Sequence, residues 1–175
     1  MLRSYDDYYD IIAKGYDELY GEEQLKKLHF IELCMKKNDE LRDFIKPEYR
    51  LLDVGCGSGI STDHFLVKEK VGIDPSQTLI KIAVDKHPRC KYNICSAQDL
   101  PFTKKEFDII ISLTAIQSFK DIEKGLIKIK NAGQRFILTF LKRSDKRRLI
   151  EESIERNFAV VKRFEEEKDI IYFCR

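Results

Sequence analysis

Short apolar runs alternate along the chain with longer stretches in which apolar residues recur every three or four positions. The runs at 51–54 and 107–113 are rich in leucine, isoleucine and valine, which is typical of strands buried on both faces of a sheet. The amphipathic stretches between the runs are typical of helices that cover such a sheet. The expected strands are 51–54, 71–74, 91–95, 107–113, 135–140, 159–164 and 169–174, and the expected helices are 22–45, one opening at 60, 76–87, 122–129 and 149–158.

Residues that end or cap helices support these assignments. Pro47 is expected to end the first long helix, and the His87-Pro88 pair is expected to end the helix that Ser76 caps. Gly133 is expected to close the helix that begins at Ile122. The alternation of strands and helices therefore predicts an α/β sheet, and the last two strands, joined by an acidic turn, read as an antiparallel hairpin.

A glycine-rich turn follows the first strand. Gly55, Gly57 and Gly59 let the backbone turn sharply and approach a ligand closely, ahead of the helix that opens at Ile60. A dinucleotide fingerprint would require its third glycine at position 60. Asp53, two residues before the first glycine, suits a ligand with an ammonium or sulfonium group better than a pyrophosphate. A phosphate- or NAD-binding loop remains an alternative.

A second acid lies in register with this turn. Asp74 ends the second strand, about 20 residues beyond the glycines, where a carboxylate can accept hydrogen bonds from both ribose hydroxyls. With the stretch 53–59, Asp74 resembles the cofactor motifs of the class I S-adenosylmethionine-dependent methyltransferases. The resemblance implies a Rossmann-like, seven-stranded αβα sandwich, mostly parallel with a C-terminal antiparallel hairpin, and S-adenosylmethionine as cofactor.

The same resemblance assigns cofactor-binding roles along the chain. Asp74 would hold the ribose, Asp99 the adenine amino group and the turn the methionine portion. Tyr16 lies in a tyrosine-rich lead-in, and an aromatic at that place often touches the methionine end, where a sulfonium over a ring is favourable by roughly 0.5–2 kcal/mol. Alternatively, these tyrosines only anchor an N-terminal helix. The implied cofactor-binding residues are Tyr16, Asp53, Gly55, Cys56, Gly57, Gly59, Asp74, Pro75, Gln98, Asp99, Leu100 and Leu113.

The residues after the fourth strand are expected to face the methyl acceptor. The segment from Leu113 to Phe119 resembles one in the enzymes that make N7-methylguanosine in small-subunit ribosomal RNA. Phe119, however, is two positions beyond Gln117, whereas that family has its aromatic directly after the glutamine. An Asn/Asp-Pro-Pro-aromatic motif is absent from this segment, which argues against exocyclic-amine chemistry of that type. Thr114 and Gln117 are the expected acceptor contacts, and no residue stands out as a general base.

Partners and acceptor follow from the same resemblance. Enzymes of this type commonly pair with a small zinc-ribbon activator protein that adds a strand beside the third strand, here 91–95. The basic cluster 142–148 is either a solvated helix start or a phosphate contact. RNA or another translation component is the favoured acceptor. The alternatives are a small-molecule methyltransferase and a non-catalytic cofactor-binding subunit of a partner enzyme.

Composition limits the remaining possibilities. The 175 residues predict a single methyltransferase domain, with a helical lead-in at 1–46 and a cofactor-binding core at 47–175. The net charge of +2 neither requires nor excludes nucleic acid. The five cysteines contain no Cys-x-x-Cys pair, so neither a metal site nor a disulfide framework is expected, and a cytoplasmic location fits best. No apolar run has the length of a membrane span.

Overall fold

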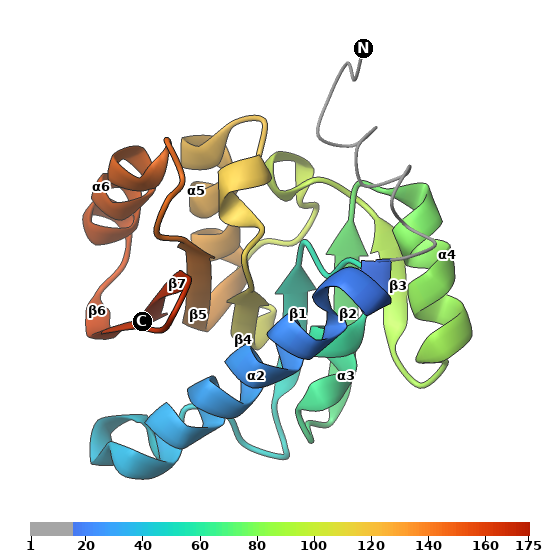
Figure 1. Cartoon of the computed structure of the whole chain (residues 1–175), viewed down its shortest axis with the longest axis horizontal. Coiled ribbons are helices and arrows are strands. Elements are labelled where there is room, and N and C mark those ends of the chain that lie inside the picture. Colours follow the sequence, from blue (N-terminus) through green and yellow to red (C-terminus); the bar gives the residue numbers. More distant parts are fainter. Residues whose placement is uncertain (1–15) are drawn as a thin grey trace.

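The computed structural model describes the backbone of residues 16–175 and the side chains of residues 21–175. Seven strands form one sheet in the order β3-β2-β1-β4-β5-β7-β6 (Figure 1). The first five strands run parallel, and β7 is antiparallel to both β5 and β6. The predicted fold class is thus confirmed. The strands are β1 (Arg50–Val54), β2 (Glu69–Asp74), β3 (Lys91–Ile94), β4 (Phe107–Ser112), β5 (Gly133–Leu141), β6 (Val160–Glu165) and β7 (Asp169–Cys174).

Helices cover both faces of the sheet, and an apolar cluster lies under each layer. Neighbouring residues of β1 point to opposite faces, so Leu52 joins one cluster and Leu51 the other. The first cluster includes Leu126 of α5 and Ile150 of α6, whereas the second includes Leu28 of α2, which crosses the sheet in Figure 1. The helices are α2 (Tyr16–Lys37), α3 (Ile60–His64), α4 (Gln77–Lys86), α5 (Ile122–Ala132) and α6 (Arg147–Asn157).

The strand order places the predicted ligand corner at the centre of the sheet. β1 pairs with β2 on one side and with β4 on the other. Successive strands therefore extend the sheet in one direction from β1 to β3 and in the opposite direction from β4 to β5. Ligands of open α/β sheets bind at such a switch point, outside the carboxyl ends of the strands. The glycine turn after β1, Asp74 at the end of β2 and the segment after β4 all lie at the carboxyl ends of these central strands.

The predicted boundaries of the first helix are wrong. α2 begins at Tyr16 and ends at Lys37, not at 22 and 45. Asn38 has an extended backbone, with φ −123° and ψ 117°, and its side-chain amide donates to the Cys34 carbonyl at 2.8 Å. This bond satisfies a carbonyl group at the helix end. Leu41 and Phe44 continue the apolar pattern and are buried, although both lie beyond the end of the helix. The apolar spacing therefore predicted the burial of these residues but not their backbone conformation.

Two other helix ends are set by residues with an extended backbone. α3 stops at His64, so Phe65 and Leu66 do not belong to the helix after the glycine turn as expected, and this helix has only five residues. Gly133 is the residue that closes α5, as predicted, but its conformation is extended and not left-handed. Its φ of −134° and ψ of 178° make it the first residue of β5. A Cβ atom at Gly133 would lie 2.6 Å from Cγ1 of Ile110, so close packing between β4 and β5 requires glycine there.

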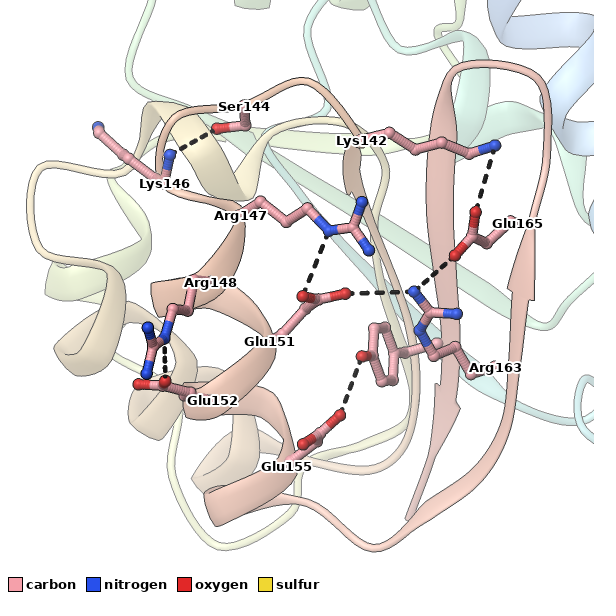
Figure 2. Close-up of polar contacts among 11 residues, drawn as sticks. Lys142, Ser144, Lys146, Arg147, Arg148, Glu151, Glu152, Glu155, Arg163 and Glu165 are labelled. Carbon is pink, nitrogen blue, oxygen red and sulfur yellow. Dashed lines mark hydrogen bonds and ion pairs between the residues drawn. The ribbon is translucent and has the colours of Figure 1, made fainter.

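The two edges of the sheet differ. β3 forms one edge, and three of its four residues are exposed, including Ile94, whose surface is 56% accessible. β6 forms the other edge, where a register shift between Val160 and Lys162 interrupts its pairing with β7. Arg163 of β6 forms ion pairs with Glu165 of the same strand and with Glu151 of α6 (Figure 2).

Candidate active site

The turn after β1 depends on glycine. Gly55, Gly57 and Gly59 have φ values of 78°, 53° and 89°, all in the left-handed region that side chains disfavour. At Gly55 a Cβ atom would also lie 2.4 Å from the Cβ atom of Ala115, so no side chain fits between the turn and the segment after β4. The N–H groups of Gly55 and Cys56 both donate to the Ile73 carbonyl of β2, which fixes the turn against the neighbouring strand.

Asp74 joins the glycine turn to the next helix. One carboxylate oxygen accepts from the N–H of Gly57 at 3.0 Å, and the other accepts from the N–H of Ser76 at 2.9 Å. Ser76 in turn caps α4, since its hydroxyl accepts from the Leu79 N–H at 3.2 Å, as predicted. These two backbone contacts fix the orientation of the Asp74 carboxylate, which lines the cavity described below.

Asp53 is fully buried beneath the turn. Its Oδ2 accepts from the hydroxyls of Ser61 at 2.6 Å and Thr62 at 2.8 Å, both at the start of α3. Its Oδ1 is buried and has no hydrogen-bond partner in the described part of the chain. Burial raises the pKa of Asp53 to about 6; the two hydroxyl bonds lower it, and the charge of Asp74 adds to the rise. An anionic oxygen without a partner therefore lies under the turn at neutral pH.

A cavity opens at the carboxyl ends of the central strands. It lies beside the glycine turn, Asp74 and the segment after β4, and it combines polar groups with apolar walls. Of the predicted cofactor residues, it exposes Gly55, Asp74, Pro75, Gln98 and Leu113, and Thr114 also lines it. Ala115, Ser118 and Phe119, which belong to the segment expected to face the acceptor, also line the cavity, and the other lining residues are Cys95, Ser96, Ala97 and Lys120.

Among the residues that the structure describes, the other predicted cofactor residues, which include Asp53, Gly57 and Gly59, lie outside the cavity lining. Cys56 is buried, and burial raises the pKa of its thiol well above the usual value, so this thiol stays protonated. Leu100 is buried in the core. Asp99 has a side chain that is 65% accessible, and it accepts a hydrogen bond from the Ser96 hydroxyl. The side chain of Tyr16 lies outside the described residues. The binding roles of all these residues stay predictions.

Thr114 is held by a buried polar network that the sequence did not reveal. Its φ of 56° is left-handed, and its N–H donates to the hydroxyl of Thr139 at 2.8 Å. Its hydroxyl donates to Oδ1 of Asp169 at 3.0 Å and accepts from the ammonium group of Lys27. Lys27 of α2 and Asp169 of β7 are both buried and form an ion pair of 2.9 Å. The Thr114 hydroxyl proton is thus already donated within the protein, and its role as an acceptor contact stays a prediction.

Gln117 follows in the short helical turn Ile116–Ser118. Its side-chain amide donates to the Thr114 carbonyl at 2.7 Å, which leaves the side-chain oxygen Oε1 buried without a partner among the described residues. Lys146 donates to the main-chain carbonyl of Gln117 at 2.8 Å. These contacts fix the orientation of the Gln117 amide, but Gln117 is not among the residues that line the cavity, so its role as an acceptor contact stays a prediction.

The basic cluster 142–148 is largely neutralised by glutamates. Figure 2 shows Arg147 and Arg148 paired with glutamates one turn further along α6, at 3.3 and 2.8 Å, and Lys142 paired with Glu165 of β6 at 3.5 Å. Arg163 bridges Glu151 and Glu165 at 3.2 and 2.8 Å. These contacts favour the solvated, ion-paired alternative for most of the cluster over phosphate binding.

The described residues show neither a metal site nor a membrane span. No group of three or more histidine, cysteine, aspartate or glutamate side chains in the described part of the chain is arranged to hold a metal ion. None of the described helices is both long and apolar enough to cross a membrane.

Comparison with known proteins identifies the domain that contains this cavity. The sequence profile of the methyltransferase domain family matches residues 52–134, which span the glycine turn, Asp74 and the segment after β4. The chain carries a class I S-adenosylmethionine-dependent methyltransferase domain. The predicted family is confirmed. The glycine turn, the unpartnered buried oxygen of Asp53 and the carboxylate of Asp74 at the cavity fit the cofactor of this family, and their binding roles stay predictions.

Relatives of the methyltransferase domain act on different acceptors. The chain is 31% identical over 122 residues to a probable 18S rRNA (guanine-N(7))-methyltransferase of Dictyostelium discoideum, covering 63% of the chain and 41% of that protein. It is 27% identical over 113 residues to a ubiquinone/menaquinone biosynthesis C-methyltransferase of Campylobacter jejuni, covering 57% of the chain and 48% of that protein. The chain thus spans about half or less of the length of these two relatives.

A solved structure matches nearly the whole fold. It contains the Trm112 methyltransferase activator of Haloferax volcanii in complex with a candidate methyltransferase. The match has a TM-score of 0.77 and 13% sequence identity and covers 99% of this chain and 98% of the other. At this identity the match establishes the fold alone.

Proposed function

We propose that the chain transfers the methyl group of S-adenosylmethionine to an acceptor in RNA or another translation component. The observation that carries the proposal is the cavity at the switch point, where the glycine turn, Asp74 and the segment after β4 meet. In this assignment Asp74 holds the ribose, Asp99 holds the adenine amino group, and the 53–59 turn holds the methionine portion. The similarity to an rRNA guanine methyltransferase supports the RNA acceptor.

The chemistry requires little acid–base catalysis from the protein. The sulfonium of the bound cofactor supplies a methyl group that is already activated. When bound, the cofactor would give this methyl group to a nucleophilic atom of the acceptor and would leave as S-adenosylhomocysteine. The residues of the cavity then act by aligning the acceptor and excluding water. Gln117 lies between the lining residues Ala115 and Ser118, and in this proposal its side chain contacts the acceptor from behind the cavity wall.

A small-molecule acceptor is the second candidate. Leu113 and Phe119 give the cavity apolar walls, and one relative is a quinone-biosynthesis C-methyltransferase. The pairing of the basic cluster with glutamates also weakens the case for an extended phosphate-binding face. A labelled-methyl assay with separate RNA and metabolite pools distinguishes the two acceptors. A non-catalytic cofactor-binding subunit would label neither pool.

Replacement of Asp74 by asparagine tests the cofactor site. Asparagine keeps an oxygen for the Gly57 N–H but loses the charge that strengthens hydrogen bonds from two ribose hydroxyls. We expect calorimetric titration to show an affinity for S-adenosylmethionine about 100-fold lower than that of the wild type. Asp85→Asn, an exposed carboxylate on α4, is the control. Equal affinity of both variants would contradict the assignment.

We also propose a small zinc-ribbon activator protein as partner, docked along the edge strand predicted at 91–95. The fold of a methyltransferase from an activator complex supports this. β3 is an edge strand of the sheet, and the exposed Ile94 and Val84, which are 56% and 48% accessible, offer apolar surface beside it. A partner strand added there would pair with the main chain of β3 and cover these side chains.

An exposed-residue pair tests this edge. Ile94→Lys places a charge beside the proposed partner strand, whereas Leu149→Lys places one on α6 at a similarly accessible apolar position. In co-expression with a Trm112-type activator, we expect Ile94→Lys to lose co-purification and Leu149→Lys to retain it. Retention by both variants would exclude β3 as the docking edge.

We retain the cytoplasmic location and the single-domain organisation as proposals. All five cysteines are free, which fits a reducing compartment.

A further inference from the structure

The backbone conformation of Thr114 is unusual. A β-branched residue with a φ of 56° is a genuine outlier, since its side chain crowds the backbone in the left-handed region. Such conformations persist only where the surroundings hold them, and they gather at ligand-binding sites. Thr114 lines the cavity of the methyltransferase domain, so its strained backbone forms part of the wall of the site.

The groups that hold Thr114 come from three distant parts of the chain. Thr139 of β5 accepts from its N–H, while Asp169 of β7 and Lys27 of α2 bind its hydroxyl. Lys27 and Asp169 are 2% and 0% accessible. Removing two charges from water is costly, and an apolar pair of similar volume often serves stability as well. Because such an ion pair adds little to stability, its contact with the strained Thr114 suggests that it serves the site.

The position of Thr114 identifies that role. Its neighbour Ala115 lies against Gly55, so the backbone conformation of Thr114 determines how the segment after β4 packs against the glycine turn after β1. Asp74, at the end of β2, marks the other end of the cavity, where the ribose is assigned. With the ribose assigned to Asp74 after β2 and the adenine to Asp99 after β3, the amino-acid half of a bound cofactor would lie toward β1 and β4, which follow in the strand order.

We propose that the buried Lys27–Asp169 ion pair is a positioning group that holds Thr114 in its left-handed conformation and thereby shapes the amino-acid half of the S-adenosylmethionine site. This inference rests on the proposed function, since it assumes that the cavity holds this cofactor. It places a residue of α2, outside the matched family region 52–134, in control of the cavity wall after β4.

The test compares two ligands that share the adenosine half. S-adenosylhomocysteine carries the amino-acid half, and 5′-methylthioadenosine lacks it. The double variant Lys27→Met/Asp169→Leu removes both charges and leaves no buried charge without a partner. We expect calorimetry to show about a tenfold or greater loss of affinity for S-adenosylhomocysteine, with affinity for 5′-methylthioadenosine changed by less than about twofold. A defect that is only structural would lower both affinities alike.

The matched control is Glu23→Gln/Lys168→Met. This neighbouring ion pair also links α2 to the chain just before β7, but it is solvent-exposed and does not contact Thr114. It should bind both ligands as the wild type does. If the charge-free double variant fails to fold, Thr139→Val is the second variant. It removes the hydroxyl that lies 2.8 Å from the N–H and 3.3 Å from the hydroxyl of Thr114, while the Thr139 carbonyl still accepts from that N–H at 3.1 Å, so a smaller loss with the same selectivity is expected.

The outcomes separate the two proposals. If the wild-type chain binds neither ligand, the proposed function is wrong, and the positioning role is overturned with it. If the wild type binds both ligands and the folded variants lose no affinity, or lose both affinities equally, the positioning role alone is overturned. Selective loss of S-adenosylhomocysteine in the variants, with the control unchanged, supports it.

Discussion

Replacing Lys27 by methionine is expected to lower the free energy of unfolding by about 3–5 kcal/mol. The ammonium group of Lys27 is the cation beside the carboxylate of Asp169, and both side chains are buried. Methionine matches the length of lysine, so the change leaves packing nearly intact but strands a charge in the core. Chemical denaturation monitored by circular dichroism, with one denaturant series per variant, measures the difference.

The charge-free double variant Lys27→Met/Asp169→Leu is the informative comparison. Because it leaves no unpaired charge, it should recover most of the stability that the single variant loses. Disruption of the exposed Glu23–Lys168 pair should change stability by less than about 1 kcal/mol. If Lys27→Met and the exposed-pair variant proved equally stable, the ion pair would contribute nothing measurable, contrary to its burial.

Replacing Asp53 by asparagine is expected to stabilise the folded chain while weakening cofactor binding. Burial raises the pKa of Asp53 from 3.8 to about 6, so at pH 7 folding confines an ionised carboxylate in the interior. Because the folded state holds the proton more tightly, this group favours folding fully below pH 3.8, and that contribution is lost as the pH rises through 6. A shift of this size corresponds to up to about 3 kcal/mol at pH 7.

Thermal unfolding from pH 5 to 7 measures this effect. The wild type should gain stability from Asp53 as the pH falls through 6, and Asp53→Asn should be more stable at pH 7 and lack that gain. At pH 7 the variant should bind S-adenosylmethionine more weakly, because the anion near the methionine portion is gone. A variant less stable than the wild type at pH 7 would show that the hydroxyl bonds to Asp53 outweigh the cost of burying its charge.

The sequence predicted the sheet well because buried parallel strands leave a direct mark. A short, continuous apolar run rich in isoleucine, such as 107–113, is typical of a strand that is covered on both faces. The helix boundaries were harder, since apolar spacing reports burial and not backbone conformation. Leu41 and Phe44 continue the pattern of α2 although Asn38 has already ended the helix. The helix ends where the Asn38 side chain binds the Cys34 carbonyl, and the spacing of apolar residues does not reveal such a bond.

The sequence likewise predicted the local motifs of the site but not its long-range contacts. The glycine turn and Asp74 are local motifs, so their spacing placed them correctly at the switch point. The Lys27–Asp169 pair joins residues near opposite ends of the chain, and a lysine on an amphipathic helix ordinarily reads as a solvent-facing residue. Phe119 directly follows the short helical turn Ile116–Ser118 and lines the cavity, a position that the spacing of apolar residues does not indicate.

The unequal edges of the sheet have a consequence for how the protein behaves when it is made in excess. β6 carries a bulge and paired charges, devices that discourage strand pairing between chains. β3 is short and has a charged pair only at its start, where Lys91 pairs with Glu69, whereas Ile94 at its other end is exposed. Aggregation during overproduction should therefore start at one defined edge, and added charge along β3 should improve soluble yield more than any change along β6.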